Sequence, residues 1–286
     1  MLQIKDHPTK ATVYRAGDTW IRQYKSMHDL IHDAGKIDSS VASGTFERGC
    51  DWTWGGGHDD VPGTLRKIGN GLPLPDADFG KFEQAQRDFK RAAAKAMDTA
   101  KVSGKRRRVD KRMGGRIRMS RIYNDHPKPF VRKTRKATAP MLRVGFRSNG
   151  NGYVDAAGLA HTAALAAGLT RCLFRNGFSV ELSSVVASSF GSKWDICATT
   201  VVPSGTKPST PRILACSTPA IHRCLAATVR EVDIGQKFGS ACEIPEYYRT
   251  KYWDVFVNLD STQGKVVQQL VDVLGKIKDK SLTNER

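Results

Sequence analysis

The spacing of apolar residues changes character near residue 141. Beyond it, short apolar runs at residues 142–146, 178–186 and 194–202 have the length and composition of strands. Between the first two runs, the alanine-rich residues 154–175 are apolar on nearly every side and predict a buried helix. Asn176 and Gly177 follow as a helix stop.

The rest of this half continues the alternation. Ser217 or Thr218 with Pro219 predicts the start of a helix, residues 253–259 predict a strand, and residues 263–277 predict an amphipathic helix. Alternating strands and helices are typical of a mainly parallel sheet covered by helices. We therefore expect an α/β fold, with a C-terminal three-layer α/β domain.

The N-terminal half has a less regular pattern. Asp18 is a candidate N-cap for a helix that ends at Gly35, because Trp20, Ile21, Tyr24, Met27 and Ile31 follow with helical spacing. Later segments predict a short strand at residues 46–57, a short helix that begins near Asp60, and a long amphipathic helix over residues 79–97. We expect an α+β N-terminal part.

These differences in the pattern of apolar and polar residues divide the chain into three regions. Residues 1–100 form a helical and short-stranded N-terminal region, residues 101–140 a strongly basic connecting arm, and residues 141–286 the α/β domain. A chain of 286 residues is long enough to bury a sizeable core in one or two domains.

Positive charge is concentrated rather than spread over the chain. The chain has a net charge of +18, and residues 101–147 contain seventeen basic and two acidic residues, so this stretch contributes +15 and the rest only +3. Arginine dominates its first cluster, and the planar arginine side chain suits bidentate contacts with phosphate. A charge this concentrated favours a polyanionic partner.

The arm supplies the candidate nucleic-acid-binding residues. They are Lys105, Arg106, Arg107, Arg108, Lys111, Arg112, Arg116, Arg118, Arg121, Arg132, Lys133, Arg135 and Lys136. Within the arm, Tyr123 and Phe130 are the only aromatic residues before Phe146, so phosphate contact is favoured over base stacking. Arg116 and Arg118 alternate with Ile117 and Met119, which predicts that part of the arm is sheet.

Two other interpretations of the arm remain open. It is compatible with a contact to an acidic protein or membrane surface, and with solvated charge that only keeps the chain soluble. Oligonucleotide affinity that falls steeply with salt distinguishes the nucleic-acid interpretation.

Catalytic and metal motifs are weak, so we predict a non-catalytic protein without cofactor. The six cysteines form no CxxC pair and are typical of reduced core thiols rather than a zinc site. His58 beside Asp59 and Asp60 specifies neither a nucleophile nor a metal site. An enzyme with a pocket at the carboxyl ends of the C-terminal strands, lined by Asp155, Asp195 or Asp260, stays an alternative.

The order strand, loop, long helix, strand over residues 141–186 resembles the opening of a von Willebrand factor A-like domain. In metal-binding members the first strand is followed by an Asp-x-Ser-x-Ser motif. Here the corresponding residues are Arg147, Ser148, Asn149, Gly150 and Asn151. Because arginine replaces the carboxylate and would repel a cation, we predict that this metal site is absent.

Short motifs also resemble a family of uncharacterised bacterial and bacteriophage proteins. They include the tryptophan- and glycine-rich residues 52–57, Val109-Asp110-x-Arg112 and residues 176–181. The resemblance implies a phage or mobile-element origin and no established activity.

Together these patterns predict a phage or mobile-element protein that binds DNA or RNA through the basic arm without strong sequence preference. The alternative is a structural virion or assembly protein, in which the arm meets packaged genome or an acidic protein surface, and which forms homo-oligomers. The sequence contains no 18-residue apolar run, so we predict no membrane span. The N-terminus lacks signal-peptide features, so we expect the protein in the host cytoplasm or in the virion.

Overall fold

The computed structural model describes most of the α/β half and parts of the N-terminal half. The described residues are 2–4, 8–36, 76–100, 106–111, 116–117, 130–135, 141–150, 156–209, 213, 225–226, 229–230 and 240–283. The tryptophan-rich segment 46–57, the expected helix near Asp60 and the helix start at Pro219 lie outside these residues.

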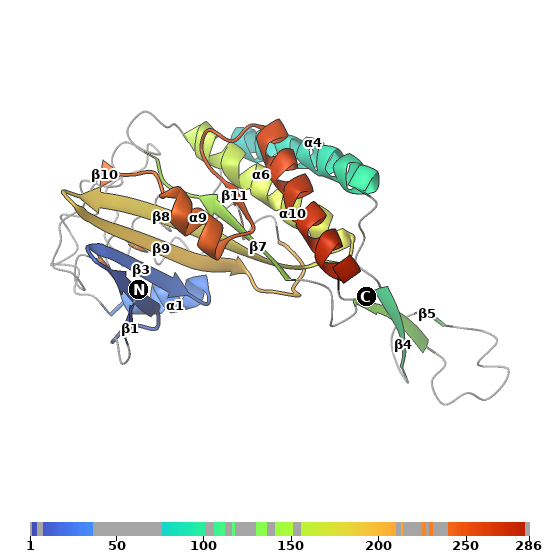
Figure 1. Ribbon diagram of the computed structural model, residues 1–286, viewed down its shortest axis with the longest axis horizontal. Helices are drawn as coiled ribbons and strands as arrows, with labels where there is room; N and C mark the ends of the chain where they lie inside the picture. Colours follow the sequence, from blue (N-terminus) through green and yellow to red (C-terminus); the bar gives the residue numbers. More distant parts are fainter. Residues whose placement is uncertain are drawn as a thin grey trace.

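A mixed sheet of eight strands forms the centre of the molecule (Figure 1). Its strands are β1 Leu2–Ile4, β2 Thr12–Ala16, β3 Thr19–Tyr24, β7 Met141–Arg147, β8 Ser179–Phe190, β9 Lys193–Val202, β10 Ser240–Ala241 and β11 Val255–Val257. The order is β1-β2-β3-β9-β8-β7-β11, with β10 paired to β8. Strands from both sides of the basic segment therefore share one sheet.

The expectation of a mainly parallel sheet is wrong. β7 runs parallel to both β8 and β11, and β3 parallel to β9, but the pairs β1–β2, β2–β3, β8–β9 and β8–β10 are antiparallel. The β8–β9 pair is antiparallel because the two-residue turn Gly191-Ser192, in which Gly191 has φ 58°, joins the two strands into a hairpin. Periodicity alone does not distinguish this hairpin from a parallel pair.

The predicted helix from Asp18 to Gly35 is also wrong in its first half. Thr19–Tyr24 is strand β3, which follows a second two-residue turn at Gly17 (φ 58°) and Asp18. Helix α1 covers only Met27–Ala34; the side chain of Ser26 caps it by accepting from the backbone N–H of Asp29, and it ends at Gly35 as expected. The sheet pairing with β2 and β9 overrides the helical spacing of the apolar residues.

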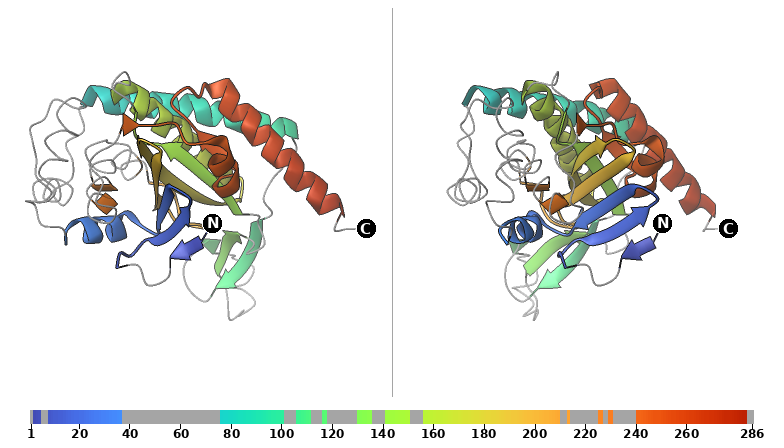
Figure 2. Two further views of the ribbon diagram at one scale, coloured as in Figure 1. Left: turned by 60° about the vertical axis from the view of Figure 1, so that its left-hand side comes forward. Right: turned by 90° about the vertical axis from the view of Figure 1, so that its left-hand side faces the viewer.

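Three long helices pack on one face of the sheet (Figure 2). They are α4 Asp76–Ala100, α6 Ala156–Arg175 and α10 Gln263–Thr283, and they agree with the three helices predicted for these parts of the chain. Phe82, Phe89, Ala93 and Met97 of α4 are buried together with alanines and leucines of α6 in the larger core. No described helix is long and apolar enough to cross a membrane.

The opposite face of the sheet has a smaller core. The short helix α9, Glu246–Tyr252, lies over it (Figure 1). Trp253 and Phe256 are buried there with Ile21, Val185 and Ile196. This second face is where the described chain leaves a cavity.

Candidate functional site

The basic segment forms a sheet of its own. β4 Arg106–Lys111 pairs antiparallel with β6 Phe130–Arg135, and β5 Arg116–Ile117 pairs with the other edge of β6. Eight predicted site residues lie on these strands: Arg106, Arg107, Arg108, Lys111, Arg116, Arg132, Lys133 and Arg135. The other five lie outside the described residues: Lys105, Arg112, Arg118, Arg121 and Lys136. We call β4 and β6 together the cationic ribbon.

The register of the ribbon sorts its residues into two faces, because directly opposed residues share a face in an antiparallel pair. Arg106 stands opposite Arg135, and Arg108 opposite Lys133. Arg116 of β5 pairs with Val131 and so belongs to the same face. Five cationic positions therefore share this face with Asp110 and Val131, whereas the other face combines Arg107, Lys111 and Arg132 with Val109, Thr134, Phe130 and Ile117.

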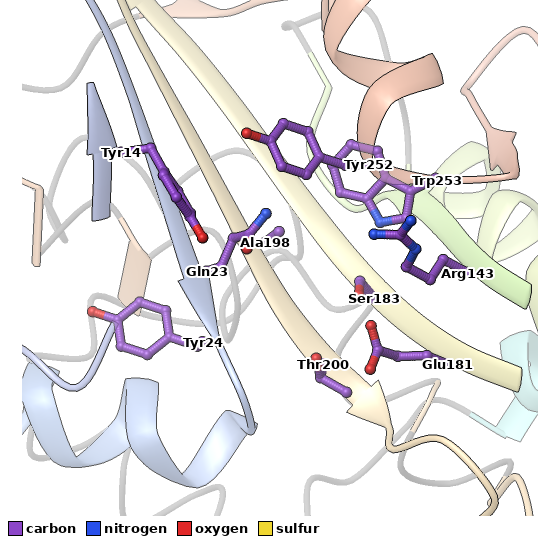
Figure 3. Close-up of a pocket in the computed structure, with 10 residues that line it drawn as sticks. All are labelled: Tyr14, Gln23, Tyr24, Arg143, Glu181, Ser183, Ala198, Thr200, Tyr252 and Trp253. Carbon is purple, nitrogen blue, oxygen red and sulfur yellow. The ribbon is translucent and has the colours of Figure 1, made fainter. Parts of the chain in front are cut away.

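A cavity of about 230 Å³ lies on the second face of the large sheet (Figure 3). Its lining residues come from five strands and from the end of α9: Tyr14, Gln23, Tyr24, Arg143, Glu181, Ser183, Ala198, Thr200, Tyr252 and Trp253. Arg143 is the third residue of β7 and Glu181 the third of β8, so the cavity lies toward the end at which these parallel strands begin.

The cavity contains one cation and one anion on neighbouring strands. Arg143 and Glu181 are directly paired in the β7–β8 register. Burial raises the pKa of Glu181 above its ordinary 4.5, and the positive charge of Arg143 opposes that rise. Two hydrogen bonds to Asp254 fix the backbone of Arg143. The N–H of Arg143 donates to the Asp254 carboxylate (2.7 Å), and the N–H of Asp254 donates to the carbonyl of Arg143 (2.8 Å).

Aromatic rings form one wall of the cavity. The Trp253 ring packs against Tyr252, with centroids 5.9 Å apart, and against Phe256 at 5.2 Å. Gly145 makes room for them, since a Cβ at this position would lie 2.7 Å from the Phe256 ring and 2.8 Å from Trp253. Burial, and then the nearby Tyr14, raise the pKa of Tyr252 to about 12. Arg143 and Trp253 both line the cavity (Figure 3).

The glycine-containing loop after β7 is bound to the sheet. The Ser148 hydroxyl donates to the carbonyl of Val185 (3.2 Å). The Asn149 side chain donates to the carbonyl of Ala187 (2.7 Å) and accepts from its N–H (3.2 Å). These polar groups hold β8, so the described part of this loop has a structural role.

Arg147 is the residue that the resemblance to von Willebrand factor A-like domains aligns with the first carboxylate of the metal-binding motif. Its side chain is buried and donates from Nη1 to the Asn258 amide oxygen at 3.5 Å. Burial lowers its pKa, and Cys242, Glu243 and Asp260 oppose that change. Among the described residues, no group of three His, Cys, Asp or Glu side chains is arranged to hold a metal ion.

The aspartates considered for a catalytic pocket do not line the cavity. Asp195 is buried and forms an ion pair of 2.5 Å with Arg22. Asp260 is exposed and lies 3.3 Å from Lys265. Asp155 and His58 lie outside the described residues. The cavity also lies at the opposite end of β7 from the carboxyl end at which we expected such a pocket.

Sequence reasoning missed the cavity residues, although a signal for two of them exists. Arg143 and Glu181 each interrupt a strand between two buried apolar residues, as in Leu142-Arg143-Val144. A charge at the alternate position of such a strand marks a sheet face that the apolar core does not cover. Tyr14 and Tyr252 are far apart in sequence, and only the pairing of the strands brings them to one cavity.

A family model described as "Domain of unknown function (DUF7192)" matches residues 6–277. No curated protein and no solved structure matches the chain.

Proposed function

The chain belongs to the DUF7192 family, and from its own charges and geometry we propose that it binds nucleic acid through the cationic ribbon without performing catalysis. The contacts are to phosphates, so binding has little sequence preference. We place this activity in a phage or mobile element, and we propose a von Willebrand factor A-like scaffold for the order β7, α6, β8. What supports the scaffold is that β7 and β8 are parallel neighbours joined through α6.

The observation that carries the proposal is the opposition of like charges across the ribbon. Arg106 faces Arg135 and Arg108 faces Lys133 in the same register. Like charges that stand directly opposite each other on neighbouring strands destabilise the pair. A polyanion on this face removes that repulsion, because each guanidinium then pairs with phosphate oxygens.

The shape of the ribbon supports the same partner. A two-stranded antiparallel ribbon fits the major groove of a duplex, and alternate residues on one strand are about 7 Å apart, so a row of cations tracks a phosphate backbone. Arg116 on β5 adds a cation at the edge of this row.

The test compares two triple variants with equal loss of charge. One is R106Q/R108Q/R135Q, on the face with five cationic positions, and the control is R107Q/K111Q/R132Q, on the other face. With fluorescent oligonucleotides titrated at several salt concentrations, the first variant flattens the dependence of log K on log salt by about two to three units, since each lost phosphate contact removes about 0.7–0.9. The control variant changes this slope by less than one unit.

Equal effects of the two variants would show that only net charge matters and would contradict a binding face. An unchanged affinity in both would remove the ribbon from the interface. Circular dichroism of each variant verifies that it is folded.

A further inference from the structure

The cavity beneath Tyr252 and Trp253 offers chemistry that phosphate binding does not use. Arg143 provides planar hydrogen-bond donors, and Glu181 beside it provides acceptors. In the described residues the two side chains form no ion pair within 4.0 Å with each other, so both are available to a ligand that carries a donor next to an acceptor. Gln23, Ser183 and Thr200 add neutral groups that can donate or accept.

The remaining wall suits a flat ring. Tyr14, Tyr252 and Trp253 line the cavity opposite and above the polar groups (Figure 3). At about 230 Å³ the cavity is smaller than the roughly 300–1,000 Å³ of sites for drug-sized ligands, so a single ring system is the suitable size. Nucleobases combine these properties, since each has an aromatic face and an edge with donors beside acceptors.

The cationic ribbon is tethered close to this cavity. β6 ends at Arg135 and β7 begins at Met141, so the connection spans at most about 20 Å when fully extended. Arg143 lies only two residues further along β7. One nucleic-acid strand can therefore contact both the ribbon and the cavity.

We propose that the cavity receives one unpaired nucleobase of a strand whose phosphates lie on the cationic ribbon. Arg143 donates to the acceptors of the base edge, Glu181 accepts from its N–H groups, and the aromatic wall stacks on the ring. This inference rests on the proposed function and adds to it a preference for single strands, because a base inside a duplex cannot enter without being extruded.

The test separates base contacts from phosphate contacts. Wild-type protein is titrated with a single-stranded oligonucleotide and with an abasic strand of the same length, which keeps the phosphates and lacks the bases. We expect the strand with bases to bind about tenfold more tightly, since a base stacked on an aromatic side chain adds affinity that the abasic strand lacks. Glu181→Gln and Arg143→Gln each reduce this ratio to near one.

Glu181→Gln gives the most decisive result, because net charge and the base contact predict opposite changes in affinity. Removing a carboxylate makes the protein more positive and would tighten binding of any nucleic acid, whereas loss of a base contact weakens binding of the strand with bases only. Arg91→Gln is the matched control for Arg143→Gln, since this exposed side chain lies on α4 on the other side of the sheet. It leaves the ratio unchanged.

The possible failures are distinguishable. If wild-type protein binds both strands equally, or Glu181→Gln tightens both, the base site is wrong and the proposed function stands. If wild-type protein binds neither strand and no duplex of the same sequence, the proposed function fails and the base site with it. If free phenylalanine abolishes the preference and guanosine monophosphate does not, the cavity binds an amino-acid zwitterion and the proposal is overturned.

Discussion

Glu181 shows how a single residue is tuned by its place in the sheet. It lies on β8 between the buried Val180 and Leu182 and is itself half-buried over the cavity. Loss of water around its carboxylate is the largest effect on its pKa, which is raised, and Arg143 counteracts part of the rise. Ionisation of this side chain therefore destabilises the folded state, as is common at sites that contact a ligand and as the proposed base contact would require.

This raised pKa predicts a pH-dependent difference in stability between wild-type protein and Glu181→Gln. Below the ordinary pKa of 4.5, Glu181 is protonated in both the folded and the unfolded state and costs nothing. As pH rises through 4.5 the unfolded state ionises first, so the free energy of unfolding of the wild type falls relative to the variant, and the difference levels off above the folded pKa. Urea unfolding of both proteins from about pH 4 to about pH 8 measures this. A relative stability that rises over this range would contradict the assignment.

At the scale of elements, the packing of α4 on α6 depends on small residues. Gly168 of α6 faces α4 so closely that a Cβ would lie 2.9 Å from the carbonyl oxygen of Gln86 and 3.1 Å from the Phe89 ring. The neighbouring alanines, Ala163, Ala164 and Ala167, are fully buried. Because the nearest atom belongs to the backbone, the two helices must move apart to admit even a methyl group.

Two glycine-to-alanine substitutions test this packing. Gly168→Ala destabilises the protein by about 1–3 kcal/mol, since overpacking outweighs the helix propensity of alanine. Gly275→Ala, in α10 where no atom lies within 4 Å of the new Cβ, stabilises it by up to about 1 kcal/mol. Chemical denaturation measures both. Stabilisation by Gly168→Ala would show that the helices are not in this close contact.

The elements also show how far sequence patterns reach. The helices α4, α6 and α10 and the strands β7, β8 and β9 follow from apolar periodicity, because each has a long pattern and a clear stop such as Gly177 (φ 94°). The direction of the strands cannot be predicted from apolar periodicity. The hairpin turns at Gly17-Asp18 and Gly191-Ser192 resemble ordinary loop or cap sequences. Of the candidate site, charge predicts the cationic segment but not the pairing of β4 with β6. The cavity depends on pairing between β3, β9, β8 and β7, which no local pattern records.

At the scale of the whole molecule, charge and scaffold are separated. The large sheet and its helices bury the apolar residues, and the small sheet with order β4-β6-β5 carries eight of the predicted cationic site residues (Figure 1). The two sheets are joined through the short connection between β6 and β7. This arrangement places the most cationic part of the chain in a sheet of its own, next in sequence to the strand that contributes Arg143 to the cavity.

The central claim is that the cationic ribbon binds phosphates, and the salt dependence of oligonucleotide binding tests it most directly. Fluorescence anisotropy of wild-type protein with a single-stranded oligonucleotide is measured between about 50 and 200 mM salt. With six to ten phosphate contacts, the affinity falls by roughly 10³ to 10⁵-fold over this range. An affinity that stays constant across the same range, or no binding at the lowest salt concentration, would contradict the account.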